Sequence, residues 1–179
     1  MLGAGGSVGL SAVEIGKLMG ARVIAAASTD DKLDVCRQRG ADETINYSTE
    51  VLKDRAKQLT DGKGVDVIYD CVGGDKAEQA LRAIAWEGRF LVVGFTAGIP
   101  SIPLNLVLLK SCQIVGVFYG AMTAREPARS SAISDQLIDW VASGTLQPYV
   151  SNRYPLEGAG EALRAMIDRT VVGKVVITP

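Results

Sequence analysis

The sequence predicts a doubly wound α/β fold, in which helices cover both faces of a parallel sheet. Short apolar runs rich in β-branched residues alternate along the chain with longer segments of helical spacing. The short runs are apolar throughout, as the strands of a sheet buried on both faces are. Glycine-rich turns separate the two kinds of segment, and the first such turn lies at the start of the chain.

Six segments are predicted to be strands or extended chain. Four of them read as buried strands: Arg22 to Ala27, Val65 to Asp70, Arg89 to Val93 and Gln113 to Val117. Gly173 to Thr178 is predicted to be a closing strand, and Gln147 to Arg153 a short extended segment. The first strand of the fold is truncated, because only Met1 and Leu2 precede the first glycine turn.

Helical spacing predicts the remaining elements. They cover Ser7 to Met19, Asp30 to Arg39, Thr49 to Thr60, Lys76 to Ala85, Ala128 to Ser143 and Leu156 to Asp168. In the first helix Val8, Ala12, Ile15 and Met19 fall on one face, and in the fifth Ile133, Leu137, Ile138 and Val141 are expected on the buried side. Asp30 is predicted to cap the second helix.

Composition excludes several classes of function. The 179 residues are 47% apolar, carry 19 basic and 20 acidic side chains, and have a net charge of -1. Neither nucleic acid nor a membrane is therefore an expected partner. The chain has no histidine, and its three scattered cysteines form no CxxC pair, so we expect no metal site. The absence of a disulfide framework and of a secretory signal predicts a cytoplasmic protein.

The turn that follows Leu2 predicts a phosphate-binding site. Its residues, Gly3-Ala4-Gly5-Gly6-Ser7-Val8-Gly9, match the dinucleotide fingerprint GxGxxG with alanine in place of the first glycine. Gly6 would let the backbone approach a pyrophosphate, and Gly9 would let the helix pack closely. The N–H groups of Ser7 and Val8 would face the anion. The alternative is a purely structural turn, which the strand–helix–strand context makes less favoured.

The end of the second strand predicts which dinucleotide binds. NAD sites place an acidic residue there to bind the ribose 2′-hydroxyl, but this position falls on Ala27 or Ser28. The Ser28 hydroxyl and the Lys32 ammonium group both suit a 2′-phosphate, so the sequence favours NADPH over NADH. The alternative is that Lys32 is an ordinary solvated helix residue, and Asp30 and Asp31 beside it count against a phosphate.

An ordered series of motifs resembles the cofactor domain of zinc-independent quinone oxidoreductases, a branch of the medium-chain dehydrogenase/reductase superfamily. The series is GAGGSVG, GARVIAAASTDDK, GADETINY, GVDVIYDCVGG, GRFLVVGF, PSIPLNLVLLKSCQIVGVFYG and YPLEGAGEALRAMIDRTVVGKVVITP. The resemblance covers essentially the whole chain. It implies a Rossmann fold and reduction of quinones or other activated alkenes and carbonyls by hydride transfer from NADPH.

The resemblance also implies a set of cofactor-binding residues. Ser7 and Val8 would hold the pyrophosphate, and Ser28, Lys32 and Tyr47 would surround the 2′-phosphate. Cys71, Val72 and Gly73 would lie near the adenosine ribose, with Cys71 an inert small hydrophobe. Gly94, Phe95 and Thr96 would approach the nicotinamide half. Val117, Phe118 and Tyr119 would line the nicotinamide pocket, although Phe118 fits the core equally well. No catalytic residue is assigned.

Family enzymes carry a substrate domain ahead of the cofactor domain, so residues 1–179 are expected to form the cofactor domain of a longer enzyme. The C-terminal helix and strand would then pack toward that substrate domain. A homodimer through the sheet edge Gln113 to Gly120, and a small electrophile such as a quinone or enone as substrate, are expected partners. The alternatives are a module that binds NADPH without turnover and an enoyl reductase domain.

Overall fold

The computed structural model describes residues 1–179 and contains eight α-helices, one short 3-10 helix and seven strands. The first half holds α1 (Ser7–Leu18), β1 (Ile24–Ala27), α2 (Asp30–Gln38), β2 (Glu43–Asn46), α3 (Leu52–Gln58), β3 (Val65–Asp70), α4 (Gly74–Arg82) and β4 (Ile84–Val92). The second half holds α5 (Asn105–Lys110), β5 (Gln113–Gly116), α6 (Tyr119–Arg125), α7 (Pro127–Ala142), β6 (Val150–Pro155), η1 (Leu156–Gly158), α8 (Ala159–Ile167) and β7 (Lys174–Thr178).

The central sheet is parallel and is divided into two parts at Leu2. β1 pairs with β2, and β3, β4 and β5 form a separate three-stranded sheet. Leu2 alone joins the two parts, because it forms isolated parallel bridges to Ala26 of β1 and to Asp70 of β3. The predicted doubly wound architecture is thus confirmed.

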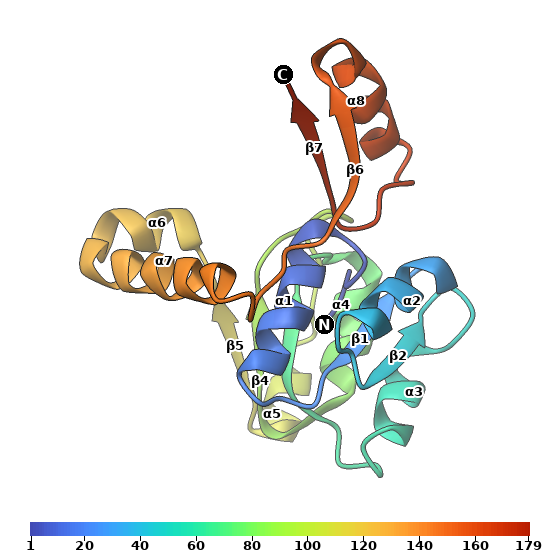
Figure 1. Ribbon diagram of the computed structural model, residues 1–179. Coiled ribbons are helices and arrows are strands. Elements are labelled where there is room, and N and C mark those ends of the chain that lie inside the picture. The colour runs from blue at the N-terminus through green and yellow to red at the C-terminus, as the bar shows by residue number, and fades with distance from the viewer.

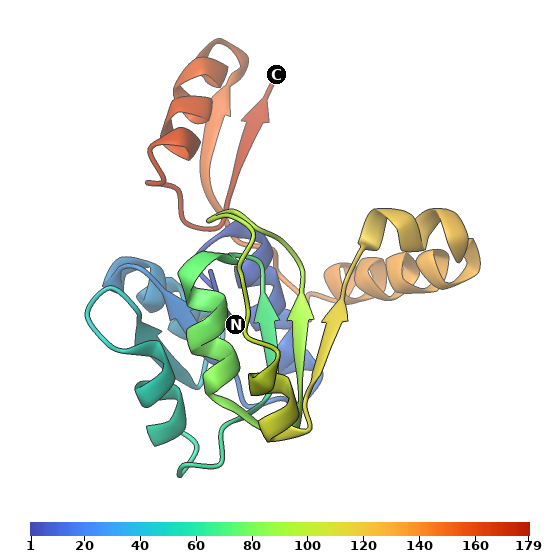
Figure 2. The same cartoon turned by 180° about the vertical axis from the view of Figure 1, so that it is seen from behind.

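Helices cover both faces of this sheet, as predicted. α1 lies in front of the strands in Figure 1, whereas α4 and α5 lie on the opposite face, which Figure 2 shows from behind. A cluster of 14 buried residues, with Phe90, Ile84 and Leu81 among the largest, fills the space between the strands and α3, α4 and α5. A second cluster, which includes Leu10 and Val13, lies under α1.

The residues that α1 buries are not the apolar residues that its spacing places on one face. Gly9, Leu10, Val13 and Gly16 are its buried residues, whereas the Val8 side chain is 53% exposed and that of Met19 76%. The helix turns its glycines toward the sheet because they allow close approach. A Cβ at Gly16 would lie 3.2 Å from both the Met1 Cε and the Val23 Cγ2.

The prediction that Asp30 caps α2 is wrong. Thr29 occupies the N-cap position without a side-chain cap, and Asp30 is the first helical residue. The Asp30 carboxylate instead accepts a hydrogen bond of 2.9 Å from the buried Asn46 Nδ2. Asp30 therefore ties the start of α2 to the end of β2.

Two units project from the central body. α6 and α7 form one, and β6, η1, α8 and β7 form the other, whose two strands pair in parallel (Figure 1). The prediction that α7 buries Ile133, Leu137, Ile138 and Val141 is wrong, since α7 has no buried residue and Ile138 is 64% exposed. No helix of the chain combines the length and apolarity needed to cross a bilayer.

Candidate functional site

The glycine turn between Leu2 and α1 packs tightly against the strands on either side. The Leu2 N–H donates to the Tyr69 carbonyl at 2.9 Å, and the Ala4 N–H donates to the Ala26 carbonyl at 3.0 Å. Gly9 brings α1 against the turn, because a Cβ there would lie 2.2 Å from the Gly3 carbonyl oxygen. The close approach expected of Gly9 is therefore present.

Gly6 stands in a different environment. Its backbone is extended, with φ of -83°, and the only atom near a Cβ added there is the Gly3 carbonyl oxygen at 3.4 Å. The fold itself does not require glycine at this position. A side chain would project into open space in front of the first turn of α1, where an approaching ligand would need that space.

A cleft of about 560 Å³ opens beside this turn at the carboxyl ends of the strands, and 20 residues line it. Eleven of the predicted residues lie together in its wall: Gly6, Ser7, Val8, Gly9, Ser28, Lys32, Tyr47, Cys71, Val72, Gly94 and Thr96. In open α/β sheets this edge is where ligands bind. The structure thus assembles the glycine turn and the ends of β1, β3 and β4 around one space.

The charge of the cleft is positive. Lys32 and Arg169 are its charged lining residues, and the lining contains no aspartate or glutamate. The Lys32 side chain packs against Gly5, where an added Cβ would lie 2.6 Å from the Lys32 Cβ. The Lys32 Nζ donates to the Arg169 carbonyl oxygen at 3.1 Å. Neither Asp30 nor Asp31 lines the cleft.

The amides of the first turn of α1 are available to an anion. Gly6 is the N-cap, no side chain caps the helix and no acidic residue lies in its first turn. The first N–H groups of a helix have no partner within the helix, and Ser7, Val8 and Gly9 lie in the cleft wall. The helix dipole adds partial positive charge at the same place.

Tyr47 and Ser28 form the wall beyond Lys32. The Tyr47 N–H donates to the Ala27 carbonyl at 3.1 Å, which places Tyr47 beside the end of β1. The Lys76 ammonium group lies 5.4 Å from the centroid of the Tyr47 ring, within range of a cation–π interaction. Burial raises the pKa of the Tyr47 hydroxyl, so this group is a neutral hydrogen-bonding side chain at neutral pH.

The turn after β3 is organised by the buried Asp70. Its Oδ1 accepts hydrogen bonds from the N–H groups of Val72 at 2.8 Å and Gly73 at 2.9 Å. The Cys71 thiol donates to the Leu2 carbonyl oxygen at 3.2 Å, and burial raises its pKa. Cys71 is therefore a protonated thiol in the wall. Gly73 does not line the cleft, and an added Cβ there would lie 2.5 Å from the Gly98 carbonyl oxygen.

The residues predicted for the nicotinamide half are only partly brought into the cleft. Gly94 and Thr96 line it, but Phe95, Val117, Phe118 and Tyr119 do not. Phe118 is 78% exposed because β5 is an edge strand and α6 leads the chain away from the body. The roles of these four residues in binding stay predictions.

Nine lining residues were not among the predicted ones, and the most consequential come from the end of the chain. Met166, Arg169, Val171 and Gly173 follow α8 back to the glycine turn, where the Gly173 N–H donates to the Gly5 carbonyl at 2.8 Å. Arg169 lies in the last of the quoted motifs but was assigned no role, since its place in the cleft depends on this long-range contact. Gly3, Gly5, Ala27, Val93 and Ala97 complete the set.

The chain offers no fit for a zinc site of its own. It has no histidine, and no group of three or more cysteine, aspartate or glutamate side chains lies close enough to hold a metal ion.

The parallel sheet, the glycine turn at a helix N-terminus and the basic cleft define a Rossmann-type dinucleotide-binding domain. A family model described as zinc-binding dehydrogenase matches residues 7–142. The chain belongs to this family, in its quinone oxidoreductase branch of the medium-chain dehydrogenases/reductases.

Three relatives illustrate the similarity. The chain is 40% identical to a quinone oxidoreductase-like protein 2 homolog of Nematostella vectensis, over 97% of this chain and 48% of the relative. It is 31% identical to a 2-haloacrylate reductase of a Burkholderia species, over 98% and 54%. It superposes on Escherichia coli quinone oxidoreductase complexed with NADPH with a TM-score of 0.86 and 31% identity, over 99% and 56%. The chain thus spans about half the length of these relatives.

Proposed function

We propose that the cleft binds NADPH and that the chain is the cofactor-binding part of an oxidoreductase that reduces quinones or other activated alkenes and carbonyls. The observation that carries the proposal is the cleft itself, in which free helix amides and two cationic side chains face a space without carboxylates. The NADPH-bound quinone oxidoreductase and the 2-haloacrylate reductase among the similar proteins support both the cofactor and the substrate class.

In this proposal the pyrophosphate lies against the first turn of α1. The N–H groups of Ser7 and Val8 donate to it, and the open space at Gly6 lets it approach the backbone. The 2′-phosphate lies between Lys32 and Arg169, with the hydroxyls of Ser28 and Tyr47 at its side. Charge-assisted hydrogen bonds of this kind contribute roughly 1.5–3 kcal/mol each, which is enough to set the preference over NADH.

Bound NADPH supplies a hydride from its nicotinamide ring to the electron-poor substrate. The residues of this chain orient the ring and exclude water. Gly94 and Thr96 are the proposed contacts within the cleft, while Phe95, Val117, Phe118 and Tyr119 are proposed to cover the ring from the edge of the body. No side chain of the chain is assigned as a proton donor.

We further propose that residues 1–179 act beside a substrate domain of the same enzyme. The exposed apolar side chains of α8, such as Leu163 and Ile167, form a surface suited to that contact.

The β5 edge, with exposed Ile114 and Val115, is the proposed homodimer contact. A cytoplasmic location fits such an enzyme. Binding of NADPH without turnover is the expected behaviour of the chain alone, whether its parent is a quinone reductase or an enoyl reductase.

Titration of the purified chain with NADPH and with NADH, followed by nucleotide fluorescence, tests the proposal. Lys32→Ala and Arg169→Ala are each expected to weaken NADPH binding about ten-fold or more and to leave NADH binding nearly unchanged. Lys63→Ala is the matched control, because Lys63 is an exposed lysine outside the cleft wall. Equal losses for both nucleotides would contradict the 2′-phosphate role, and no binding of either nucleotide would overturn the cofactor assignment.

A further inference from the structure

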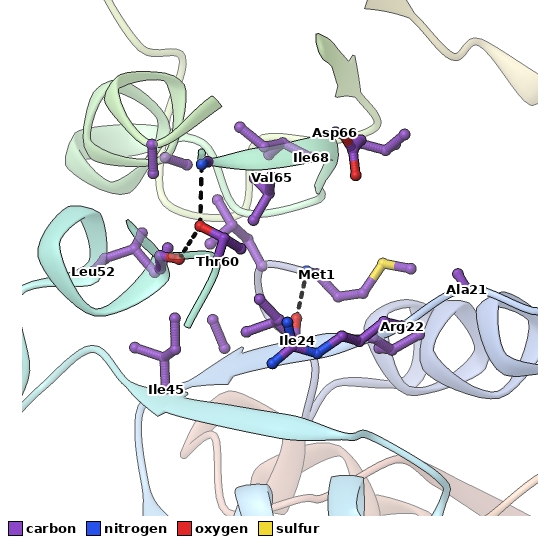
Figure 3. Close-up of a pocket in the computed structure, with 18 residues that line it drawn as sticks. Met1, Ala21, Arg22, Ile24, Ile45, Leu52, Thr60, Val65, Asp66 and Ile68 are labelled. Atoms are coloured by element: carbon purple, nitrogen blue, oxygen red, sulfur yellow. Dashed lines mark hydrogen bonds between the residues drawn. The ribbon is translucent and has the colours of Figure 1, made fainter. Parts of the chain in front are cut away.

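The unit formed by β6, η1, α8 and β7 projects from the central body, and its elements contact chiefly one another (Figures 1 and 2). Packing within the body is more extensive. Beside Met1, apolar side chains of β1, β2, α3 and β3 meet, and the Met1 amino group donates to the Ile24 carbonyl at 2.9 Å (Figure 3). Neither core cluster contains a residue after Cys112, and Tyr149 is the one later residue that packs against either of them. The attachment of the projecting unit therefore depends on few contacts, and Tyr149 is central to them.

Tyr149 lies directly ahead of β6, and its ring contacts the backbone of Gly173, which lies directly ahead of β7. A Cβ added at Gly173 would lie 2.6 Å from the Tyr149 Cδ1 and 3.2 Å from the Leu10 Cδ2. The Gly173 backbone thus packs against both the tyrosine ring and α1. Because the Gly173 N–H also donates to the Gly5 carbonyl at 2.8 Å, the residue under the ring is the one that is bonded to the glycine turn.

Two charged residues of the body hold the Tyr149 ring. The Arg39 guanidinium group lies 5.0 Å from the ring centroid, within range of a cation–π interaction. Arg39 is the C-cap residue of α2, and its Nε lies 3.5 Å from the Glu14 Oε1 of α1. The Glu14 side chain is only 10% exposed, and burial raises the pKa of its carboxyl against the opposing influence of Arg39. Glu14, Arg39 and Tyr149 thus form one cluster, here called the ring cluster, which uses the tyrosine ring rather than its hydroxyl.

The segment that leads from α8 to Gly173 brings Arg169 to the cleft. Arg169 and Val171 line the cleft, and the Arg169 carbonyl accepts from the Lys32 Nζ at 3.1 Å. The Arg169 side chain is exposed, so its position is set by the backbone that bears it rather than by surrounding side chains. Because Gly173 follows Arg169 closely in the chain, the contacts that fix Gly173 also limit where the Arg169 side chain can reach.

We propose that the ring cluster holds Arg169 at the cleft and thereby sets the selectivity for NADPH over NADH, a role that rests on the proposed function of the cleft. In that function Arg169 contacts the 2′-phosphate, which NADH lacks. None of the three residues of the ring cluster lines the cleft, so they act through Gly173 and not by contact with the nucleotide. They are therefore positioning residues.

The test measures the dissociation constants of NADPH and NADH for variants of the ring cluster. Tyr149→Leu removes the ring and is expected to weaken NADPH binding about five-fold, the size of a partly buried cation–π contact. NADH binding is expected to change by less than about two-fold, because the bonds of Leu2 and Ala4 to the neighbouring strands hold the pyrophosphate site. Tyr149→Phe keeps the ring and is expected to retain both affinities. A purely structural role of Tyr149 would weaken both nucleotides together.

Arg39→Met removes the cation over the ring and leaves the Glu14 carboxylate buried without its partner, so this variant is expected to have a lower Tm. The double variant Glu14→Gln/Arg39→Met removes that unpaired charge. It is expected to recover most of the Tm and still to bind NADPH about five-fold more weakly, with NADH unchanged. Arg37→Met is the matched control, because Arg37 is an exposed arginine of α2 outside the ring cluster.

The Arg169→Ala background shows whether the effect passes through Arg169. There Tyr149→Leu is expected to lose most of its effect on NADPH binding, because the side chain that it positions is gone. An undiminished effect in that background would overturn the proposal. So would equal losses of NADPH and NADH affinity, or an unchanged NADPH affinity, in Tyr149→Leu itself.

Amide hydrogen exchange at Gly173 tests the attachment without any nucleotide. The exchange is expected to be at least about five-fold faster in Tyr149→Leu than in Tyr149→Phe, and equal rates would overturn the role of the ring. If the unsubstituted chain bound neither nucleotide, the proposed function would fail, whereas the exchange rates would still decide whether the ring holds Gly173 in place.

Discussion

In the 179-residue chain on its own, the pH dependence of stability between pH 6 and 8 is expected to come from a single group, the Met1 amino group. The chain has no histidine, so no side chain with an ordinary pKa titrates in this window. Burial lowers the pKa of the Met1 amino group from 8.0 to about 6, against the opposing influence of Cys71, Cys36 and Asp70. Between these two pKa values the unfolded chain binds a proton that the folded chain does not.

The free energy of unfolding is therefore expected to rise as pH increases from 6 to 8. Two pKa units correspond to about 2.7 kcal/mol at 1.36 kcal/mol per unit. N-terminal acetylation removes the titrating charge but keeps an N–H that can donate to the Ile24 carbonyl. The acetylated chain is expected to be flat over this range and to equal or exceed the free chain at pH 6.

Urea unfolding at half-unit intervals from pH 5.5 to 8.5, for the free and acetylated chains, measures the effect. Parallel pH profiles for the two chains would refute the reasoning, because the slope would then come from another group. The buried thiols act in a separate window. Burial raises the pKa of Cys36 to about 11, so its contribution is a loss of stability as pH rises above about 8.5.

Three further predictions concern the turn, an ion pair and the core. Gly6→Ala is expected to leave the Tm unchanged and to weaken the binding of NADPH and of NADH at least ten-fold. Gly9→Ala is expected to lower the Tm, because its Cβ would meet the Gly3 carbonyl. Thermal melts and nucleotide titrations separate the two effects. Hydrogen bonds from Lys17 and the Val23 N–H lower the pKa of Asp42. Asp42→Asn is therefore expected to lower the free energy of unfolding by about 1 kcal/mol or less at neutral pH. Urea melts should show this difference between the two chains vanish as pH falls through the lowered pKa. Phe90→Ala empties a fully buried site and is expected to cost about 3–5 kcal/mol in urea unfolding, and a loss under 1 kcal/mol would contradict the assigned core.

The sequence predicted those elements whose residues are uniform in character. β3 begins and ends where the apolar run Val65 to Asp70 indicated. β2 was not predicted, because Glu43–Asn46 mixes polar and apolar residues and only Ile45 and Asn46 are buried. α7 shows a second limit of prediction from the sequence. Its apolar spacing marks an apolar face, but it does not show which element packs against that face. In this chain the face is left largely exposed.

In the candidate site, too, residues with a local sequence signal were predictable and those placed by long-range contacts were not. The turn from Gly3 to Gly9 was predictable because its chemistry is local, and Lys32 because it follows a strand end by a fixed interval. Arg169 was not, because it is held at the cleft by contacts between segments far apart in the sequence, the hydrogen bonds of Gly173 to Gly5 and of Lys32 to the Arg169 carbonyl. Gly5 itself shows what steric reasoning adds, since its missing side chain makes room for Lys32 rather than for a ligand.

The contact between Gly5 and Gly173 also makes the cleft depend on two segments that are synthesised far apart in time. One wall contains Lys32 and the facing wall contains Arg169, which leaves the ribosome 137 residues later. A nascent polypeptide thus presents Lys32 without Arg169 until the segment up to Gly173 has emerged. In the proposed function, full affinity for the nucleotide is then expected only after that segment has folded back onto the glycine turn.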